Sequence, residues 1–372
     1  MNLVSFDYPP FDGGIARLCG AIALEASRAG VDVRVFSQQG PAVGVDVPPV
    51  PVSRVPSRRP LREAALMARL APYRAGLTVS GIWYPEGLAV AALRPGRHVV
   101  LAHGLELMPP PEPWRRRTWA ELQRRVLEGA DLVVANSRYT SGLVGRVAPN
   151  ARVATVPLAV DQLRFSPGSV AEARQRWSFD DRRVVLTVSR LAGYKAHDAI
   201  LRALALVPPG ERQRLVYAIA GRGGYEATLR SLAQQLGVAE QVRWLGFVDD
   251  EALPSLYRAA DLFALTTRES TERAEVEGFG LVFLEAQGCG IPALGANTGG
   301  IPDAIAEGDG GWLVAQDDVA AIARHLRDLV REPERYAAQG RLARARVERE
   351  FTWAHYWQRL SAALTGAGIA IE

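Results

Sequence analysis

Two basic side chains stand where a strand is expected to end in the second half of the sequence. Arg190 and Lys195 belong to the run Ser189-Arg190-Leu191-Ala192-Gly193-Tyr194-Lys195, which directly follows an expected strand over 184–188. Doubly wound sheets bind their ligands beyond the carboxyl ends of the strands. Because arginine offers a planar fork of donors and lysine a compact point charge, the pair predicts a site that holds a diphosphate. The alternative is two ordinary surface cations.

Two carboxylates form the second candidate set. Glu277 and Glu285 flank the run Gly278-Phe279-Gly280-Leu281, a Gly-rich turn that opens an expected helix over 282–288. Free N–H groups at a helix start favour a phosphate, so Glu277 would face whatever hangs from that phosphate. Glu285, farther along the helix, would accept hydrogen bonds from hydroxyls. The alternative makes Glu285 a solvated helix residue and Glu277 part of a helix cap.

The basic residues are almost all of one kind. The chain of 372 residues has 44 Lys and Arg side chains, and Lys195 is its single lysine. A GC-rich coding bias explains the excess of arginine, since it removes lysine wherever arginine will serve. The one lysine that remains is therefore expected where arginine would not serve.

Short β-branched runs alternate with amphipathic stretches in both halves of the chain, which predicts strands separated by helices. The first half has expected strands at 3–6, 31–36, 77–82, 98–102, 131–135 and 153–156, and helices at 15–29, 60–71, 86–93, 114–129 and 137–146. The second half has expected strands at 184–188, 215–220, 242–245, 262–265, 292–295 and 312–314, with helices between them and at the end. Such alternation gives parallel sheets covered on both faces, hence two Rossmann-like α/β domains that join near 161–168.

The composition narrows the class of protein. Hydrophobic residues make up 48% and charged residues 23%, so the chain can fill sizeable cores. No apolar run approaches the ~18–20 residues of a spanning helix, and Met1–Asp7 lacks the pattern of a signal peptide. Cys19 and Cys289 have no metal-type spacing and are expected to be buried thiols. These features predict a protein of the reducing cytoplasm.

Charge is unevenly divided along the chain. Residues 1–165 carry a formal charge of +7 and residues 166–372 a charge of −3. A basic half indicates an anionic partner, such as an acidic lipid surface or a phosphorylated substrate, or merely an arginine-rich surface. Nucleic acid is not expected, because no recognised binding module is present.

The helix expected at 114–129 has two interpretations. One places an anionic membrane against the basic and aromatic residues at its start and against a nearby arginine group: Trp114, Arg115, Arg116, Arg54, Arg58, Arg59 and Arg62. The other is a packed helix with a solvated side, because Trp119, Leu122, Val126 and Ala130 form one apolar stripe and the charges opposite it are of both signs.

Beyond the two candidate sets, several segments together resemble one family, the retaining GT-B glycosyltransferases of glycosyltransferase family 4. The resemblance covers nearly the whole chain, and the combination of the carboxylate pair with the Arg/Lys pair is its specific part. The further matching segments are Pro9–Gly14, His103-Gly104-Leu105-Glu106, Asp131–Ser137, Asp161 with Arg164–Pro167, Leu256–Phe263 and Thr298–Asp303.

The family resemblance implies a fold and a reaction. The fold is GT-B: an acceptor-binding domain at 1–165 and a nucleotide-sugar donor domain at 166–351 face each other across a cleft, and a C-terminal helix at about 352–366 packs back on the first domain. The reaction moves a hexose, such as mannose or glucose, from a nucleoside-diphosphate sugar to the hydroxyl of a free or lipid-linked acceptor, with retention at the anomeric carbon. The resemblance thus implies an enzyme of glycolipid, polysaccharide or other glycoconjugate biosynthesis, cytoplasmic or attached to the inner face of the membrane.

Roles carry over from the family residue by residue. Arg190 and Lys195 would hold the diphosphate and stabilise the leaving group, while Glu277 would bond sugar hydroxyls. The other implied donor contacts are the backbone N–H groups of Phe279, Gly280 and Leu281 for the distal phosphate, Glu285 for the ribose, Gly14 for close approach of the phosphates, and the 221–223 and 246–248 loops for the base. His103 would lie beside the sugar and acceptor, or would be a structural histidine at a strand end.

The expected mechanism needs neither a metal nor a cofactor. No Asp-x-Asp motif stands at a strand end, since Asp180-Asp181 and Asp249-Asp250 are adjacent pairs. Arg190 and Lys195 would replace a divalent metal as charge neutralisers. With Glu277 on sugar hydroxyls, no nucleophile faces the anomeric carbon, and the family's front-face mechanism is adopted: the leaving phosphate takes the acceptor proton.

Three features depart from the family or stand outside its motifs. Ala196-His197 follows the diphosphate lysine where many members have Gly, and Ala159-Val160-Asp161 replaces the usual Asn-Gly-Val-Asp. The loop 268–276 is longer and more charged than a tight turn needs, and it would close over the donor or be mobile.

Two alternative functions remain. One is a GT-B scaffold or partner protein without catalysis, which the intact Glu277, Arg190 and Lys195 disfavour. The other is related chemistry on the same fold, such as a sugar-nucleotide epimerase or a phosphorylase. The sequence leaves the sugar, the base and the acceptor open, with GDP-mannose and UDP-hexoses both possible.

Overall fold

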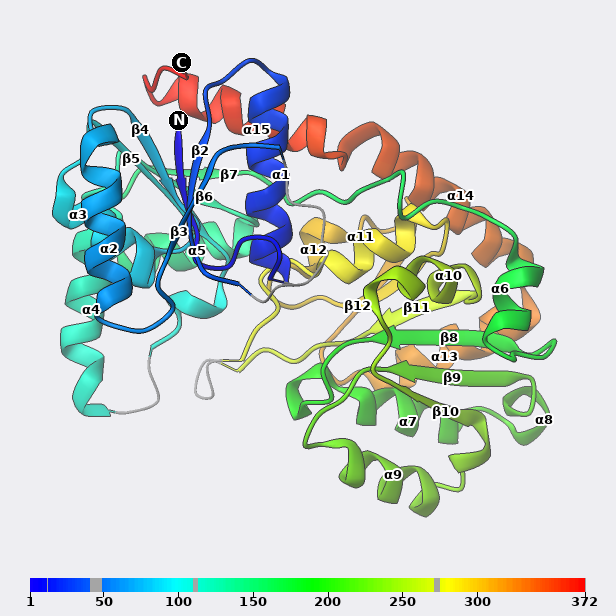
Figure 1. The fold of residues 1–372 in the computed structure, drawn as a ribbon. Coiled ribbons are helices and arrows are strands. Elements are labelled where there is room, and N and C mark those ends of the chain that lie inside the picture. The colour runs from blue at the N-terminus through cyan, green and yellow to red at the C-terminus, as the bar shows by residue number, and fades with distance from the viewer. Residues whose placement is uncertain (12, 41–48, 110–112, 271–274, 372) are drawn as a thin grey trace. The chain divides into compact units, whose positions relative to one another are not determined.

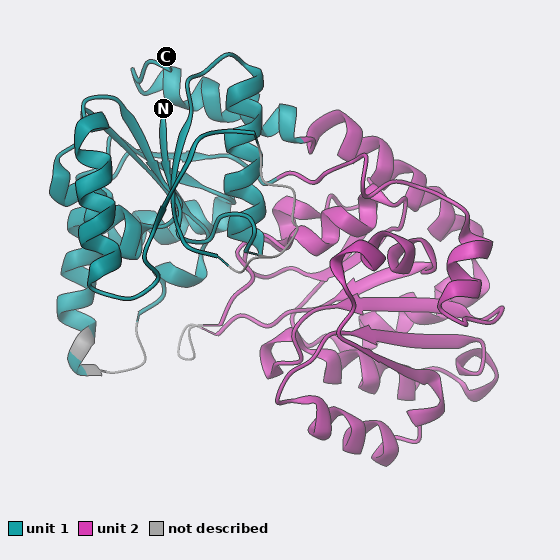
Figure 2. Ribbon diagram, viewed as in Figure 1, with its two compact units in different colours: residues 1–158, 353–372 teal, residues 159–352 magenta. Residues whose placement is uncertain are grey.

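The chain folds into two compact units. The computed structural model describes residues 1–11, 13–40, 49–109, 113–270 and 275–371. Unit 1 contains residues 1–158 and 353–372, and unit 2 contains residues 159–352 (Figure 2). The first division falls at 158/159, a few residues before the predicted join, so the segment 159–168 belongs to unit 2.

Unit 1 is a parallel sheet with helices on both faces (Figure 1). Its strands, in sheet order, are β3 (Val52–Val55), β2 (Arg34–Gln38), β1 (Asn2–Val4), β4 (Leu77–Ser80), β5 (Arg97–Ala102), β6 (Leu132–Ala135) and β7 (Val153–Thr155). Its helices are α1 (Gly14–Arg28), α2 (Leu61–Leu70), α3 (Leu88–Leu93), α4 (Pro113–Glu128), α5 (Arg138–Val147) and α15 (Trp353–Gly366), with short helical turns η1 (Ala71–Tyr73), η2 (Trp83–Gly87) and η3 (Leu105–Leu107).

One strand of unit 1 is absent from the sequence-based expectation. β3 pairs in parallel with β2 at the edge of the sheet, immediately after a Pro-rich stretch. Its four residues, Val-Ser-Arg-Val, are too few to establish a period-two pattern. Proline next to a strand is compatible with an edge position, because an edge strand needs only one ladder of hydrogen bonds.

Unit 2 repeats the architecture with six parallel strands. In sheet order they are β10 (Val242–Gly246), β9 (Leu215–Ala220), β8 (Arg183–Val188), β11 (Leu262–Leu265), β12 (Ala293–Ala296) and β13 (Gly311–Val314). The helices are α6 (Val170–Arg176), α7 (His197–Leu206), α8 (Pro209–Arg212), α9 (Glu226–Gln235), α10 (Leu253–Arg258), α11 (Leu281–Gly288), α12 (Ile301–Ala304), α13 (Val319–Arg331) and α14 (Pro333–Glu350), with turns η4 (Gly193–Lys195), η5 (Ala239–Gln241) and η6 (Asp250–Ala252).

Both sheets are doubly wound, so each has a topological switch point. The chain starts in the middle of each sheet, builds outward to one edge, and then returns to build the other. The strand order reverses between β1 and β4 in unit 1 and between β8 and β11 in unit 2. Ligands of such sheets bind in the crevice beyond the carboxyl ends of the strands at this point. The β8–β11 pair is the place where the Arg190 and Glu277 loops both begin.

Helix packing explains how the sheets are held. In unit 1, α2 and α3 pack over an apolar cluster that includes Val4, Phe36 and Leu66, while α1 and α15 pack together on the other face (Figure 1). In unit 2, α7, α9 and α13 cover a core that includes Tyr217 and Leu326. The last helix of the chain therefore belongs to unit 1. Both cysteines, Cys19 and Cys289, are buried free thiols, and burial raises the pKa of each to about 12.

A buried carboxyl in unit 1 makes stability depend on pH. Glu86 lies in η2 and is 3% exposed. Its Oε1 accepts the Phe6 N–H at 3.0 Å, and within the described residues its Oε2 has no hydrogen-bond partner. Burial raises the pKa of Glu86 from 4.5 to about 7. Because the pKa of Glu86 is higher in the folded state than in the unfolded state, the contribution of this carboxyl to the free energy of unfolding is fully present below about pH 4.5. That contribution is lost as the pH rises through about 7.

Glu86→Gln is therefore expected to flatten this pH dependence. The neutral amide removes the cost of a buried carboxylate, so the variant should be more stable than the wild type by about 2–3 kcal/mol at pH 8.5 and nearly equal to it at pH 5. Urea unfolding of both proteins at the two pH values measures the difference. A variant whose stability relative to the wild type is the same at both pH values would contradict the assignment to Glu86.

Candidate active site

The two loops at the switch point of unit 2 bring the predicted cation and carboxylate into contact. Lys195 lies in η4 after β8, and Glu277 lies in the loop between β11 and α11. The Lys195 Nζ donates to Glu277 Oε2 at 2.6 Å, and the two side chains are 12% and 19% exposed. The ammonium also lies 5.0 Å from the centre of the Tyr194 ring. A charge-assisted hydrogen bond of this kind fixes both groups in a partly desolvated place.

Arg190 lies at the start of the loop that carries Lys195, two residues after the end of β8. Its side chain is exposed, and its Nη2 donates to the Tyr194 hydroxyl at 3.0 Å. Tyr194 is thus shared between Arg190 and the Lys195 ammonium. The structure thus places both cations on the turn after β8, and Glu277 contacts Lys195 of this turn from the loop before α11.

Glycines allow the neighbouring loop to approach this turn. A Cβ on Gly221, whose φ is +138°, would lie 1.9 Å from the Ser189 carbonyl oxygen, and one on Gly223 would lie 2.2 Å from the Leu191 carbonyl oxygen. The Gly221 N–H also donates to the Gly246 carbonyl at 2.6 Å. The two loops that are predicted to hold a base, 221–223 and 246–248, therefore adjoin each other, with the Arg222 guanidinium 5.9 Å from the Phe247 ring.

The start of α11 is shaped by one glycine. Gly280 is the residue before the helix, with φ +91°, and a Cβ there would lie 2.5 Å from the Phe283 ring. Phe279 is buried behind it, while Leu281 is partly exposed. The first N–H groups of an α-helix have no partner inside the helix, so this end suits an anion.

Glu285 lies inside unit 2, on α11. It is 4% exposed, and its Oε2 accepts from the Tyr257 hydroxyl at 2.8 Å. The interpretation of Glu285 as a solvated helix residue is therefore wrong. The residue before α11, Gly280, has no side chain to cap the helix, and the Glu277 carboxylate is bonded to Lys195.

The Thr298–Gly300 turn holds the backbone of Glu277. The Gly300 N–H donates to the Glu277 carbonyl at 2.9 Å, and a Cβ on Gly299, whose φ is +53°, would lie 2.4 Å from the same oxygen. Thr298 Oγ1 donates to the Thr267 carbonyl at 2.7 Å, which fixes the segment that leaves β11. The segment Thr298–Asp303, which matches the family in sequence but has no role assigned from the sequence, therefore holds the backbone of Glu277 in place.

The departure at 196–197 also has a structural explanation. Ala196 adopts a left-handed conformation with φ +57°, which favours glycine, and its side chain is buried. His197 is fully buried, with Nε2 3.0 Å from Ser189 Oγ and Nδ1 3.0 Å from the Tyr217 hydroxyl. Burial lowers the pKa of His197 to about 4, so the ring is neutral at pH 7. The histidine supports the residue next to Arg190 rather than adding a charge.

Two predicted site residues belong to unit 1, whereas those above belong to unit 2. Gly14 begins α1, after Gly13 with φ +141°. His103 follows β5 and donates from Nε2 to the Gly81 carbonyl at 2.7 Å, which leaves Nδ1 without a hydrogen-bond partner among the described residues. Its backbone is fixed as well, because His103 N donates to Glu106 Oε1 at 2.6 Å. His103 therefore has a structural contact through one ring nitrogen and an available second one.

The arginines proposed to meet a membrane are partly engaged inside unit 1. Arg54 donates to the Pro9 carbonyl at 2.6 Å, and Arg62 lies over the Phe6 ring at 4.1 Å with 14% of its side chain exposed. Arg59 contacts Tyr84 and Glu63. These contacts remove Arg54 and Arg62 from the expected lipid-facing group.

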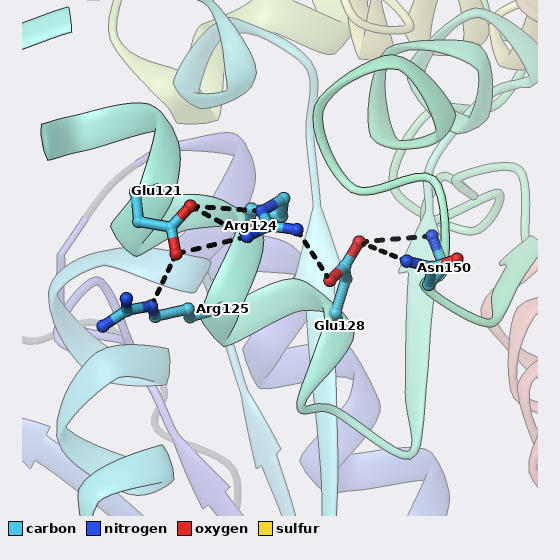
Figure 3. Close-up of polar contacts among 5 residues, drawn as sticks. All are labelled: Glu121, Arg124, Arg125, Glu128 and Asn150. Carbon is cyan, nitrogen blue, oxygen red and sulfur yellow. Dashed lines mark hydrogen bonds and ion pairs between the residues drawn. The ribbon is translucent and has the colours of Figure 1, made fainter. Parts of the chain in front are cut away.

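On α4 the charges are paired along the exposed side. Glu121 forms ion pairs with Arg124 at 2.9 Å and with Arg125 at 2.7 Å. Glu128 contacts Arg124 and Asn150 (Figure 3). The opposite stripe packs inward, since Val126 is buried and Trp119 lies edge-on to Trp83 at 4.8 Å. The helix therefore has the packed and solvated sides of the second interpretation, while Trp114 at its start is 79% exposed. The side chain of Arg115 lies outside the described residues.

The described residues contain neither a candidate metal site nor a candidate membrane span. No three His, Cys, Asp or Glu side chains lie together as a metal site in the described part of the chain. Likewise, none of the helices traced in the described ranges has both the length and the hydropathy to span a bilayer. The tip of the loop 268–276, residues 271–274, lies outside the described residues.

Comparisons with known proteins agree across the whole chain. The family model described as "Glycosyl transferases group 1" matches residues 169–346, and the one described as "Glycosyltransferase Family 4" matches residues 12–164. A GDP-mannose-dependent alpha-(1-6)-phosphatidylinositol monomannoside mannosyltransferase from Mycolicibacterium smegmatis is 33% identical over 98% of both chains. A D-inositol 3-phosphate glycosyltransferase from Saccharomonospora viridis is 32% identical over 92% of this chain and 86% of its own.

Solved structures match in fold. HepE from Anabaena in complex with UDP superposes with a TM-score of 0.79, at 21% identity and over 98% of this chain and 99% of its own. Sucrose-phosphate synthase from Thermosynechococcus elongatus gives a TM-score of 0.80, at 22% identity and over 98% of both chains. Two doubly wound parallel-sheet units with these neighbours match the architecture known as GT-B.

Proposed function

Because the chain belongs to the group 1 glycosyltransferases of family 4, we propose that it moves a hexose from a nucleoside-diphosphate sugar to an acceptor hydroxyl with retention at the anomeric carbon. The observation that carries the proposal is the 2.6 Å contact of Lys195 with Glu277 at the switch point of unit 2. In the proposed function, the Lys195 ammonium binds the diphosphate and the neighbouring Glu277 carboxylate accepts hydrogen bonds from the sugar hydroxyls.

We propose GDP-mannose as the donor and an inositol-bearing phospholipid as the acceptor. The relative that covers 98% of this chain is named as GDP-mannose-dependent and as acting on phosphatidylinositol monomannoside. A second group of relatives is named for D-inositol 3-phosphate. Inositol is the acceptor feature that both names share.

Each donor part has a matching group in unit 2. Arg190 and Lys195 bind the diphosphate, and the N–H groups at the start of α11 bind its distal phosphate. Glu277 accepts hydrogen bonds from sugar hydroxyls, while Glu285, oriented by Tyr257, accepts from the ribose. From unit 1, Gly14 allows close approach of the phosphates, and His103 offers Nδ1 to the sugar or acceptor.

The mechanism proposed is a front-face displacement. The bond from the anomeric carbon to the leaving phosphate lengthens, charge on that phosphate is stabilised by Arg190 and Lys195, and the acceptor hydroxyl gives its proton to the phosphate as it attacks. Retaining glycosidases instead use a carboxylate nucleophile, with their two carboxyl groups ~5–5.5 Å apart. The Glu277 carboxylate is already bonded to an ammonium. This contact fits a role in accepting hydrogen bonds from sugar hydroxyls better than a role as nucleophile. A glycosyl-enzyme trapped on Glu277 would refute this mechanism.

Activity is expected without a divalent metal. We expect labelled mannose to pass from GDP-mannose to phosphatidylinositol monomannoside in EDTA, because the two cations neutralise the leaving diphosphate. Because the proposed mechanism retains the configuration at the anomeric carbon, we expect the new linkage to be α by NMR. Transfer that needs added Mg²⁺ would contradict the metal independence, and a β linkage would contradict retention. No transfer from any GDP- or UDP-sugar to any inositol-bearing acceptor would contradict the proposed function.

A lipid acceptor also makes attachment to an anionic membrane part of the proposal. Trp114 and the exposed Arg58 support such a contact, whereas Arg54 and Arg62 do not. Binding to anionic vesicles that falls with salt and weakens in Trp114→Ala, with none to neutral vesicles, is the expected result. Equal binding to both kinds of vesicle, or binding to neither, would contradict it.

A further inference from the structure

The loop between β11 and α11 contains a backbone bridge between two of its described residues, just before Glu277. Ser270 and Glu275 exchange two backbone hydrogen bonds, of 2.8 and 3.0 Å, and so form an antiparallel bridge. Arg268 precedes this bridge and Glu277 follows it, each at a separation of two residues. We call Arg268–Ser270 the first arm and Glu275–Glu277 the second arm.

Both arms touch the turn that carries the cations. The Arg268 N–H donates to the Tyr194 carbonyl at 2.6 Å, and its Nη1 donates to the Gly193 carbonyl at 3.0 Å. From the second arm, Glu277 accepts from Lys195 at 2.6 Å. All three residues of η4 are thus bonded to one arm or the other.

The Arg268 side chain is held in a single geometry. Its Nη1 and Nη2 donate to the two carboxylate oxygens of Asp198, each at 2.8 Å, and its Nε donates to Asp317 at 2.7 Å. Arg268 is 26% exposed and Asp198 12% exposed, so the fork is partly desolvated. The hydrogen bonds that Arg268 donates to the Asp198 carboxylate raise the pKa of the Arg268 guanidinium above its usual value. A two-pronged contact of this kind adds direction as well as strength, and lysine cannot form it.

Arg268 is not placed to bind the diphosphate itself. All three guanidinium nitrogens already donate to protein oxygens, and two carboxylates balance its charge. Asp198 lies in the first turn of α7, just after Lys195, so the fork ties the start of that helix to the first arm. Through these bonds Arg268 connects η4 and α7 to the loop that carries Glu277.

We propose that Arg268 is a positioning residue of the transferase site: with Asp198 it fixes η4 against both arms and so sets the placement of Lys195 relative to Glu277. The inference rests on the proposed function, because it concerns the group that binds the leaving phosphate and the group that binds the sugar. It differs from a diphosphate-binding role because the effect falls on alignment in the transition state more than on nucleotide affinity.

The test compares Arg268→Lys with Arg174→Lys. Arg174 also forms a partly buried ion pair with an aspartate, Asp261, at 2.5 Å. Asp261 directly precedes β11, whereas Arg268 follows it, so the control ion pair lies at the end of the strand away from the candidate site. The measurements are the melting temperature, the Kd for GDP and the kcat for transfer from GDP-mannose. In Arg268→Lys we expect kcat to fall about tenfold or more while the Kd for GDP changes less than about threefold. In Arg174→Lys, kcat should match the wild type.

Asp198→Asn supplies a second variant in case Arg268→Lys does not fold. It should produce the same loss of kcat, and where both singles fold the double variant should lose little more than either, because the two residues act as a unit. Arg268→Lys or Asp198→Asn with the kcat of Arg174→Lys would overturn the proposal, as would a loss confined to the affinity for GDP. A wild-type protein that neither binds GDP nor transfers a sugar would instead contradict the proposed function itself.

Discussion

Replacing Lys195 by arginine is expected to lower kcat by about 100-fold or more while leaving the melting temperature nearly unchanged. The ammonium is 2.6 Å from Glu277 and over the Tyr194 ring, in a place where it is only 12% exposed. Arginine keeps the charge but is longer and planar, so its fork must displace either Glu277 or the ring. The displaced cation would no longer lie where charge develops on the leaving phosphate.

The composition makes this substitution informative. Lys195 is the single lysine of the chain, and a coding bias is the simple explanation for the excess of arginine. Arg230→Lys is a matched control in the opposite direction, since Arg230 pairs with Glu226 on the exposed side of α9, and it should leave kcat unchanged. Near-normal turnover in Lys195→Arg would make the position of the lone lysine a coincidence and would remove Lys195 from the mechanism.

Replacing Glu277 by glutamine is expected to separate nucleotide binding from transfer. The carboxylate competes with phosphate for the Lys195 ammonium, so its removal should leave the affinity for GDP unchanged or increase it. The kcat for mannose transfer should fall by about 1,000-fold, because an amide is a weaker acceptor of sugar hydroxyl protons in the transition state. Titration calorimetry with GDP and a transfer assay with GDP-mannose measure the two quantities.

The fold should tolerate this change, which makes the outcome interpretable. The backbone of Glu277 is held by Gly300 through its carbonyl, and that bond does not involve the side chain. Transfer at the wild-type rate in Glu277→Gln would exclude the carboxylate from the reaction. Equal loss of GDP binding and of transfer would show that Glu277 acts through the architecture of the loop.

Most of the strands, and the candidate residues Lys195 and Glu277, could be predicted because their signals are local. Strands such as 215–220 and 262–265 are short apolar runs bounded by turn residues, and they have these bounds in the structure. Parallel strands then place the residues that follow β8 and β11 at one edge of the sheet. The edge strand β3 was missed because four residues beside prolines have too little pattern.

Long-range side-chain contacts could not be predicted. Arg268 and Asp198 are 70 positions apart, and nothing in either segment indicates that one will fork onto the other. In the same way, Arg54 and Arg62 look like surface cations in the sequence, yet their contacts with Pro9 and Phe6 turn them inward. The left-handed backbone of Ala196 explains why glycine is usual at that position. The alanine by itself did not indicate that this backbone conformation is needed there.

The central claim is that unit 2 binds a nucleoside diphosphate through Lys195. Thermal melting in EDTA with a panel of nucleoside diphosphates and nucleotide sugars tests it most directly. A ligand at 100 times its Kd stabilises the folded state by about 2.7 kcal/mol. This corresponds to a shift of about 3 °C if the whole chain unfolds in one transition and about 7 °C if unit 2 unfolds by itself. We predict such a shift with GDP and GDP-mannose in the wild type and its loss in Lys195→Met. No shift with any nucleoside diphosphate, or an equal shift in Lys195→Met, would contradict the claim.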